Sequence, residues 1–401
     1  MPNLDDQLGA ELEQLQAGGL YRTLRAIASA QGPRVIIDGR EFLNFSSNDY
    51  LGLADDPLLK RATINAVERY GVGAGASRLV CGNLAPYADL EEKLARFKNK
   101  ESAIVFGSGY AANVGTITAL VGEGDVIVLD KLDHASIIDG ARQSGATIRV
   151  YPHKNLKKLS DILEKCGTFR RRLIITETVF SMDGDLAPLD EILELKEKYG
   201  AWLMIDEAHA TGLYAKNRRG LAEAVGVEDK IDVTLGTLSK ALGCAGGFVV
   251  GSRVLTDHLR NKARSLIYST AMPPCIVAAA GAAVEFVMSE AGHQRRDALW
   301  RNVSELKNGL SRLGLQSASR SPIIPIAIGA ESAAMETSQK LFEQGIFVPA
   351  IRFPTVPKGK ARLRVTVTAS HTAADLQQFL SIFAAISKRI GSTVAVGVNP
   401  E

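Results

Sequence analysis

The chain is poor in cysteine and in long apolar runs, and each shortage argues against a class of protein. Its four cysteines form no CxxC pair and lie in no Cys/His cluster with the spacing of a zinc site. No apolar run is long enough to cross a bilayer, and the acidic N-terminus lacks the apolar core of a signal peptide. We therefore expect neither a disulfide scaffold, nor a metal site, nor a membrane protein, and the reducing cytoplasm is the expected compartment.

An excess of charge is also missing. The 47 basic and 44 acidic residues leave a net charge of +3, with no long block of lysine and arginine. This balance gives no support to nucleic acid or a membrane surface as the main partner. The 401 residues, 46% of them hydrophobic, allow two folded domains.

The middle of the chain alternates between two patterns. Helical stretches interleave with short apolar runs, and several of these runs are apolar along their whole length, as expected of strands covered on both faces. Such alternation predicts an α/β fold with a mostly parallel, doubly wound sheet. The predicted helices are 58–70, 87–98, 111–121, 134–143, 156–166 and 188–199, and the predicted strands 103–106, 126–129, 147–151, 173–176, 202–205, 233–235 and 247–250.

The two ends of the chain have different patterns. A helix over 8–29 and a hairpin around Asp38-Gly39 predict an N-terminal arm at 1–48. A large domain then covers 49–285. The rest, 286–401, predicts a small α+β domain, entered by helical sequence that begins at 274. Its predicted strands are 323–328, 347–351 and 361–368, and its predicted helices 332–345 and 373–390.

One lysine and one acid suggest a cofactor. Lys240 lies in a Ser/Thr/Gly-rich loop behind the apolar stretch 231–235, and Asp206 ends the apolar run 202–205. A lysine so placed can hold the aldehyde of pyridoxal phosphate as a Schiff base. The acid can keep the pyridine nitrogen protonated, so that the ring accepts electrons. Each feature alone is more often structural, but together they favour this cofactor.

A glycine-rich segment, 107–112, follows one strand and opens a helix, which suits a phosphate. It also fits G-x-G-x-x-A, and Asp130 ends the next strand, so a nicotinamide dehydrogenase is an alternative. That alternative leaves Asp206, His209 and Lys240 without a role.

Further polar residues follow the predicted strands. His134, Ser181 and His209 each lie where a ligand at the carboxyl edge of a parallel sheet would meet them. Arg364 lies on one face of an alternating strand, where a guanidinium can bind a substrate carboxylate with two hydrogen bonds.

These residues resemble the α-oxoamine synthase family, fold-type I pyridoxal phosphate enzymes that join an amino acid to an acyl thioester and release carbon dioxide. The resemblance rests on residues 44–53, 206–212 and 237–240 and extends over about residues 20–390. Segments 179–189, 268–274 and 351–357 resemble the branch that uses L-alanine and a pimeloyl thioester of coenzyme A or acyl carrier protein. Glycine with acetyl-CoA, or serine with a long acyl-CoA, are the sibling alternatives. A binding module without catalysis has little support.

The resemblance also implies roles for single residues. Lys240 would bind the cofactor and move the Cα proton, Asp206 would pair with the pyridine nitrogen, and His134 would stack on the ring. A further set would hold the rest of the cofactor and the substrates: His209 and Ser181 at the ring hydroxyl, Gly109, Tyr110 and Thr237 at the phosphate, Thr270 at the phosphate of the other subunit of a homodimer, Asn48 and Arg364 at the amino-acid carboxylate, and Arg22 at the acyl end.

Overall fold

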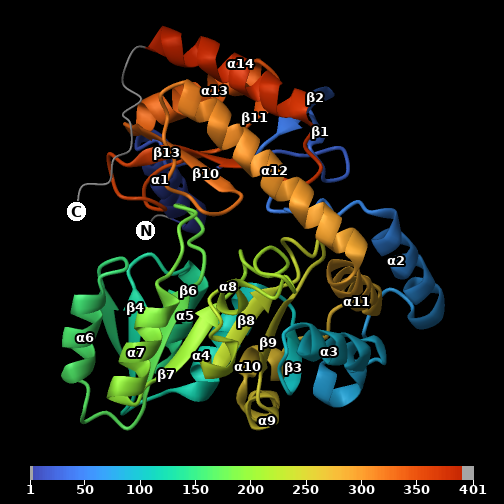
Figure 1. The fold of residues 1–401 in the computed structure, drawn as a ribbon, viewed down its shortest axis with the longest axis vertical. Coiled ribbons are helices and arrows are strands. Elements are labelled where there is room, and N and C mark those ends of the chain that lie inside the picture. The colour runs from blue at the N-terminus through green and yellow to red at the C-terminus, as the bar shows by residue number, and fades with distance from the viewer. Residues whose placement is uncertain (1–2, 391–401) are drawn as a thin grey trace.

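A seven-stranded sheet forms the centre of the large domain (Figure 1). In the computed structural model, which describes residues 3–390, its strand order is β3-β9-β8-β7-β6-β4-β5. Only β9 runs antiparallel to its neighbours, which confirms the predicted, mostly parallel sheet. The strands are β3 (Ser102–Phe106), β4 (Val126–Asp130), β5 (Thr147–Tyr151), β6 (Arg172–Glu177), β7 (Trp202–Asp206), β8 (Val233–Thr237) and β9 (Gly247–Gly251).

Each face of this sheet has its own apolar core. Ile127 and Leu129 of β4 belong to one core, whereas Val126 and Val128, which alternate with them, belong to the other. Both faces are therefore covered, as whole-strand apolarity predicts. The surrounding helices are α2 (Pro57–Tyr70), α3 (Pro86–Phe97), α4 (Gly109–Leu120), α5 (Ala135–Ser144), α6 (Leu156–Glu164), α7 (Leu189–Tyr199), α8 (Leu221–Ala224), α9 (Arg253–Lys262), α10 (Arg264–Ile267) and α11 (Pro274–Met288).

The small domain packs beside the carboxyl edge of the large sheet and contains two three-stranded sheets (Figure 1). One has the order β10-β13-β12. In the other sheet, the N-terminal hairpin β1-β2 pairs with β11, so residues 34–44 are part of the small C-terminal domain. The elements are β1 (Arg34–Ile37), β2 (Arg40–Asn44), α12 (Glu290–Arg312), β10 (Ile323–Gly329), α13 (Glu331–Glu343), β11 (Ile346–Phe347), β12 (Ala350–Ile351), β13 (Ala361–Thr366) and α14 (Ala373–Ile390).

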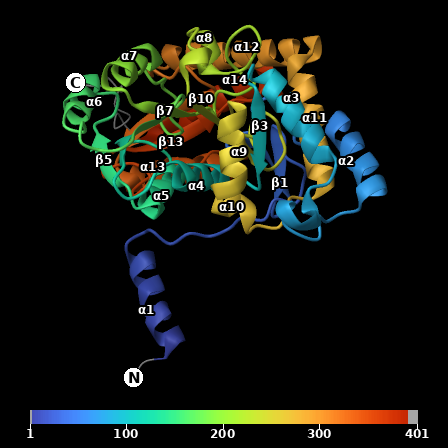
Figure 2. The same ribbon diagram turned by 90° about the horizontal axis from the view of Figure 1, so that it is seen from below.

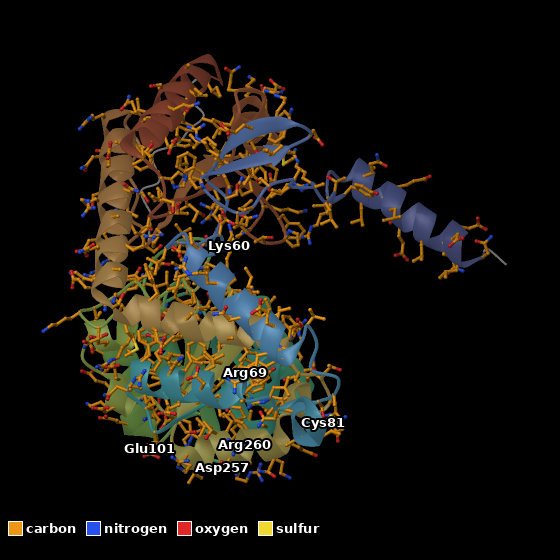
Figure 3. The ribbon with its side chains drawn as sticks, turned by 90° about the vertical axis from the view of Figure 1, so that its right-hand side faces the viewer. Lys60, Arg69, Cys81, Glu101, Asp257 and Arg260 are labelled. Atoms are coloured by element: carbon orange, nitrogen blue, oxygen red, sulfur yellow. The ribbon has the colours of Figure 1, made fainter. Side chains whose placement is uncertain are left out.

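Helix α1 (Leu4–Ala17) stands away from the rest of the molecule, as Figures 2 and 3 both show. None of its residues is buried, and Leu4, Leu8, Leu12 and Leu15 are all exposed. Figure 3 also labels Cys81, an exposed thiol on the surface of the large domain, and all four cysteines are free.

Three predicted elements were wrong in extent. The helix predicted at 8–29 ends at Ala17, because Gly18 and Gly19 follow and Gly19 adopts a φ of +64°. The strand predicted at 347–351 is two short pieces in different sheets, β11 and β12, with Pro349 between them. The helical sequence from 274 is broken at Ser289.

No single helix among residues 3–390 is long and apolar enough to cross a membrane. Helices α11 and α12 reach the required length and composition only as a pair bent by 77°.

Candidate active site

Lys240 and His209 meet at the carboxyl edge of the sheet. Asp206 ends β7, and β7 lies parallel to β8, with Asp206 opposite Leu235. The loop after β7, which carries His209, and the loop after β8, which carries Lys240, therefore lie side by side at this edge. Lys240 Nζ lies 2.9 Å from His209 Nε2.

The environment favours the uncharged forms of both groups. Burial lowers the pKa of the Lys240 ammonium, although the nearby Asp206 and Glu177 carboxylates oppose this shift. Burial also lowers the pKa of His209 well below its usual value, and the positive charge of Lys240 adds to the effect. A lowered pKa increases the fraction of lysine present as the free amine at a given pH, and the free amine is the form that attacks an aldehyde or accepts a proton.

Asp206 is held by a chain of polar side chains. Its Oδ2 accepts a hydrogen bond of 2.8 Å from Asn113 Nδ2, and its Oδ1 accepts one of 2.9 Å from the Ala208 backbone. Asn113 also donates to Ser136 Oγ at 2.9 Å, and Ser136 Oγ lies 2.8 Å from His134 Nδ1. The buried carboxylate is thereby fixed in orientation, and the same network connects it to His134.

Arg364 extends the site into the small domain. Both of its terminal nitrogens donate to Asn48 Oδ1 at 3.1 Å, and its Nε donates to the Ser181 carbonyl at 2.7 Å. Tyr50 connects this group to the first one, because its hydroxyl donates to Asn48 Oδ1 at 3.3 Å and lies 2.6 Å from His209 Nδ1. One continuous network therefore joins Arg364 to Lys240.

The start of α4 provides an anion site. Ser108 caps the helix by accepting from Ala111 N, and Gly109 comes next. A Cβ at Gly109 would lie 3.5 Å from Thr237, so the loop and the end of β8 are in close contact. Thr237 Oγ1 donates to the Gly246 carbonyl at 2.9 Å, which fixes its hydroxyl beside the loop. Backbone N–H groups at a helix N-terminus attract a phosphate.

The side chains of three predicted site residues, Tyr110, Thr270 and Arg22, make no hydrogen bond to the groups described above within residues 3–390. The Tyr110 hydroxyl donates to Asp139 at 2.7 Å, although its backbone lies in the first turn of α4. Thr270 is exposed and pairs with Ser77 in an isolated bridge. Arg22 is exposed and lines a cavity of about 740 Å³, together with Arg352 and Phe353.

Three further residues of the site are absent from the sequence prediction: Asn113, Tyr50 and Glu177. Glu177 ends β6 opposite Asp206 and is fully buried. Burial raises its pKa to about 8, and the Asp206 charge adds to the shift. The position of Glu177 at a strand end is the one signal in the sequence that could have indicated it.

Pyridoxal phosphate fits these residues. The site offers an amine, an oriented carboxylate, an imidazole at the start of α5 and a helix N-terminus, all at one sheet edge. Two buried acceptors, Asn113 Oδ1 and Glu177 Oε1, have no hydrogen-bond partner among the described residues, so the site has polar capacity left for a ligand.

Comparisons with known proteins agree with this geometry. The sequence model described as aminotransferase class I and II matches residues 40–383. The 8-amino-7-oxononanoate synthase of Symbiobacterium thermophilum is 48% identical, over 97% of this chain and 99% of its own. The enzyme of the same name from Geotalea daltonii is 49% identical, over 96% and 98%.

Two solved structures are similar in fold. A high-resolution structure of SPT with PLP internal aldimine has a TM-score of 0.91 at 33% identity, covering 97% of this chain and 100% of that one. The 8-amino-7-oxononanoate synthase of Francisella tularensis has a TM-score of 0.75 at 31% identity, covering 87% and 98%. None of these matches supports the nicotinamide dehydrogenase that the glycine spacing left open.

Proposed function

Since the chain belongs to the aminotransferase class I and II family, we propose that it is a pyridoxal phosphate-dependent acyltransferase that makes 8-amino-7-oxononanoate. It condenses L-alanine with a pimeloyl thioester and releases carbon dioxide and the free thiol, as in biotin biosynthesis. The observation that carries this proposal is identity of 48–49% over nearly the full length of relatives with that activity in their name. The network from Arg364 to Lys240 supplies the groups that such a reaction needs.

The cofactor, when bound, supplies a sink for the electron pair left at Cα of the amino acid. Asp206 would pair with the pyridine nitrogen, His134 would stack on the ring, and Gly109, Tyr110 and Thr237 would hold the phosphate. His209 and Ser181 would contact the ring hydroxyl. The family resemblance implies these roles, and the location of Asp206, His134 and His209 after strands of the large sheet supports them.

Lys240 moves the proton. Its Nζ has a lowered pKa, so it can take the Cα proton of alanine and later return one to the product. His209, held in the uncharged form by burial, accepts or donates a hydrogen bond without placing a positive charge beside the amine.

Arg364 and Asn48 orient the amino acid. A guanidinium can bind a carboxylate through two parallel hydrogen bonds, which also fixes the direction of the Cα substituents. Because Arg364 is 6% exposed and is held by Ser181 and Thr366, little side-chain freedom is lost when substrate binds.

The acyl end is assigned to Arg22 and the cavity beside residues 350–355. A guanidinium there suits the free carboxylate at the far end of a pimeloyl chain. Two sibling reactions remain as alternatives: glycine with acetyl-CoA, and serine with a long acyl-CoA. The reaction of serine is kept because solved structures of serine palmitoyltransferase (SPT) are similar in fold to this chain.

We also propose a homodimer in the cytoplasm. Helix α1 has no buried residue, which suits a segment that packs on a second subunit. Thr270 is exposed and would reach the phosphate of the partner's site, so that each site would need both chains. Sedimentation of the purified protein tests this assembly; full activity of a monomer at high dilution would contradict it.

A thiol-release assay tests the reaction. The purified protein, loaded with pyridoxal phosphate, is given alanine, glycine or serine with pimeloyl-, acetyl- or palmitoyl-CoA, and free thiol is measured for each pair. We expect alanine with pimeloyl-CoA to give the highest kcat/KM. Since a methyl group discriminates by only about 1–3 kcal/mol, glycine should retain some activity. A clear preference for glycine with acetyl-CoA would overturn the substrate assignment but not the family.

A further inference from the structure

The turn that follows β7 has two sets of contacts. Asp206 and His209 contact the candidate active site, as described above, whereas Glu207 and Thr211 contact the end of helix α3. The residue they meet there is Lys98, whose side chain is 2% exposed. Its Nζ donates to Glu207 Oε2 at 2.6 Å, to Thr211 Oγ1 at 2.9 Å and to the Arg219 carbonyl.

The ammonium is fully used in this position. It has three hydrogens and three acceptors, and all three acceptors lie in the segment 207–219. The rings of Phe97 and Phe248 lie beside it, with centroids 5.8 and 5.9 Å from Nζ. A buried ion pair of this kind commonly contributes no more stability than apolar side chains of the same volume. Stability alone therefore does not account for a lysine here.

The Glu207 carboxylate is enclosed on its other side as well. Its Oε1 accepts from Ala222 N at 3.0 Å. A Cβ at residue 220 would lie 2.1 Å from Glu207 Oε2, so the loop approaches the carboxylate at Gly220, where φ is +146°. The backbone of Glu207 donates to the Leu235 carbonyl of β8 and accepts from Ala210 and Thr211. Glu207 is thus fixed from both its side chain and its main chain.

We propose that Lys98 is a positioning residue for the reaction. It holds Glu207 and Thr211, which flank His209 in sequence, and so fixes where the imidazole lies relative to Asp206 and to Lys240. Lys98 touches none of the reacting atoms. The inference rests on the proposed function for its kinetic readout, but its spectroscopic readout needs only a cofactor bound at Lys240.

The test replaces both Lys98 and Glu207, so that neither is left as an unpaired buried charge. In the double variant Lys98→Met/Glu207→Gln, the amide introduced at position 207 can still accept from Ala222 N, and no unpaired charge remains. We expect a melting temperature close to that of the unmodified protein, an unchanged KM for pimeloyl-CoA and a kcat lower by about tenfold to a hundredfold, since a small misplacement of catalytic groups can cost that much. The pH at which the visible absorbance of the bound cofactor titrates should also shift.

Lys93→Met is the matched control. It makes the same substitution on the same helix, but the Lys93 ammonium pairs with Asp89 and Glu285, away from the 207–211 turn. Its kcat and absorbance titration should equal those of the unmodified protein. If the double variant does not fold, Thr211→Val supplies the same test, because it removes one acceptor and keeps both charges; we expect a smaller shift in the same direction.

The outcomes separate the possibilities. A folded double variant, or a folded Thr211→Val protein, with unchanged kcat and unchanged absorbance titration would overturn the positioning role and leave a purely structural pair. Should the unmodified protein release no thiol from any amino acid and thioester, the proposed function would fail, whereas the absorbance titration would still decide the role of Lys98.

Discussion

The pyridine end and the acyl end of the candidate site are built differently. At the pyridine end, the side chains of Asp206, His209 and Lys240 are each hydrogen-bonded within the protein, and those of Asp206 and His209 are buried. At the proposed acyl end, Arg22 is exposed, and neither Arg22 nor Arg352 makes a side-chain hydrogen bond or ion pair within residues 3–390. If the proposed assignments hold, the contrast means that the fold fixes the bond-making groups, whereas the choice of acyl group depends on an exposed surface with fewer contacts. Changes at the pyridine end should therefore lower kcat, and changes at the acyl end should alter KM for one substrate.

Lys240→Ala should have the largest effect. It removes the amine that we propose binds the cofactor and moves the proton, and general acid–base catalysis alone contributes about 10²–10⁴-fold. We expect turnover to fall by at least about a thousandfold, with cofactor bound only non-covalently. Borohydride reduction followed by peptide mapping gives the check, and an adduct on a different lysine would remove Lys240 from its role.

Asp206→Asn should come next. The change keeps the shape of the side chain and removes the charge that we propose pairs with the pyridine nitrogen, a kind of interaction that contributes about 10²–10³-fold. The variant should retain cofactor, as measured by absorbance after gel filtration, and lose kcat by about that factor. Near-normal turnover would show that the acid is not part of the reaction. Because Asn113 donates to the same oxygen, Asn113→Ala serves as a milder comparison.

The proximity of Asp206 and the Lys240 loop could be predicted from the sequence, for a physical reason. Asp206 and the Lys240 loop follow neighbouring parallel strands, so the sheet itself brings them together. Asn113 lies in the second turn of α4, and Tyr50 lies in a loop 159 residues from its partner His209. Nothing local in the sequence specifies those contacts.

The same distinction applies to the fold. The alternation of strand and helix predicted all seven strands of the large sheet, and several of them are apolar along their whole length because both faces of the sheet are covered. The edge strand β5 is the exception, since its middle residues are exposed. The apolar spacing continues past Gly18-Gly19 and past Pro349, so the predicted helix ran through the glycines and the predicted strand ran through the proline. Both predicted elements were therefore too long. The domain limits at 48 and 285 stay predictions. Helix α11, which covers Pro274–Met288, crosses the second limit.

Arg364→Leu should have an intermediate effect, because this residue lies between the two ends. Loss of a charged hydrogen-bonding partner costs about 1.5–3 kcal/mol, so KM for alanine should rise about tenfold to a hundredfold. The ranking of alanine over glycine and serine should not change, because all three share the carboxylate. Steady-state kinetics with each amino acid provide the measurement. A reversed ranking would mean that Arg364 contacts the side chain of the substrate instead.

Arg22→Ala should affect only the acyl end. An exposed guanidinium contributes little, and we expect KM for pimeloyl-CoA to rise by about tenfold or less. The KM for alanine and the absorbance of the cofactor should not move. An acyl-CoA of similar length without the distal carboxylate provides the control, since its KM should be equal in both proteins. A loss of kcat with both donors would instead connect Arg22 to the pyridine end.

The smallest effect should come from a group that supports the pyridine end from outside. His153 lies between Asp130 and Asp185, with each ring nitrogen 2.9 Å from a carboxylate oxygen, and so joins the end of β4 to the loop that carries Ser181. Although burial opposes it, the pairing raises the pKa of His153 to about 9. Because the folded pKa lies above the unfolded one, the stabilisation is fully present below about pH 6.5 and is lost as the pH rises through about 9.

His153→Gln can donate to only one of the two acids, so it should lower the free energy of unfolding by on the order of 1–2 kcal/mol at about pH 6, after allowance for partial exposure. Urea unfolding of both proteins at about pH 6 and about pH 10 measures the difference, which should shrink at the higher pH. At about pH 6, where both proteins are folded, kcat should change by no more than about twofold. If the difference in unfolding free energy is the same at both pH values, the charge of His153 does not stabilise the loop.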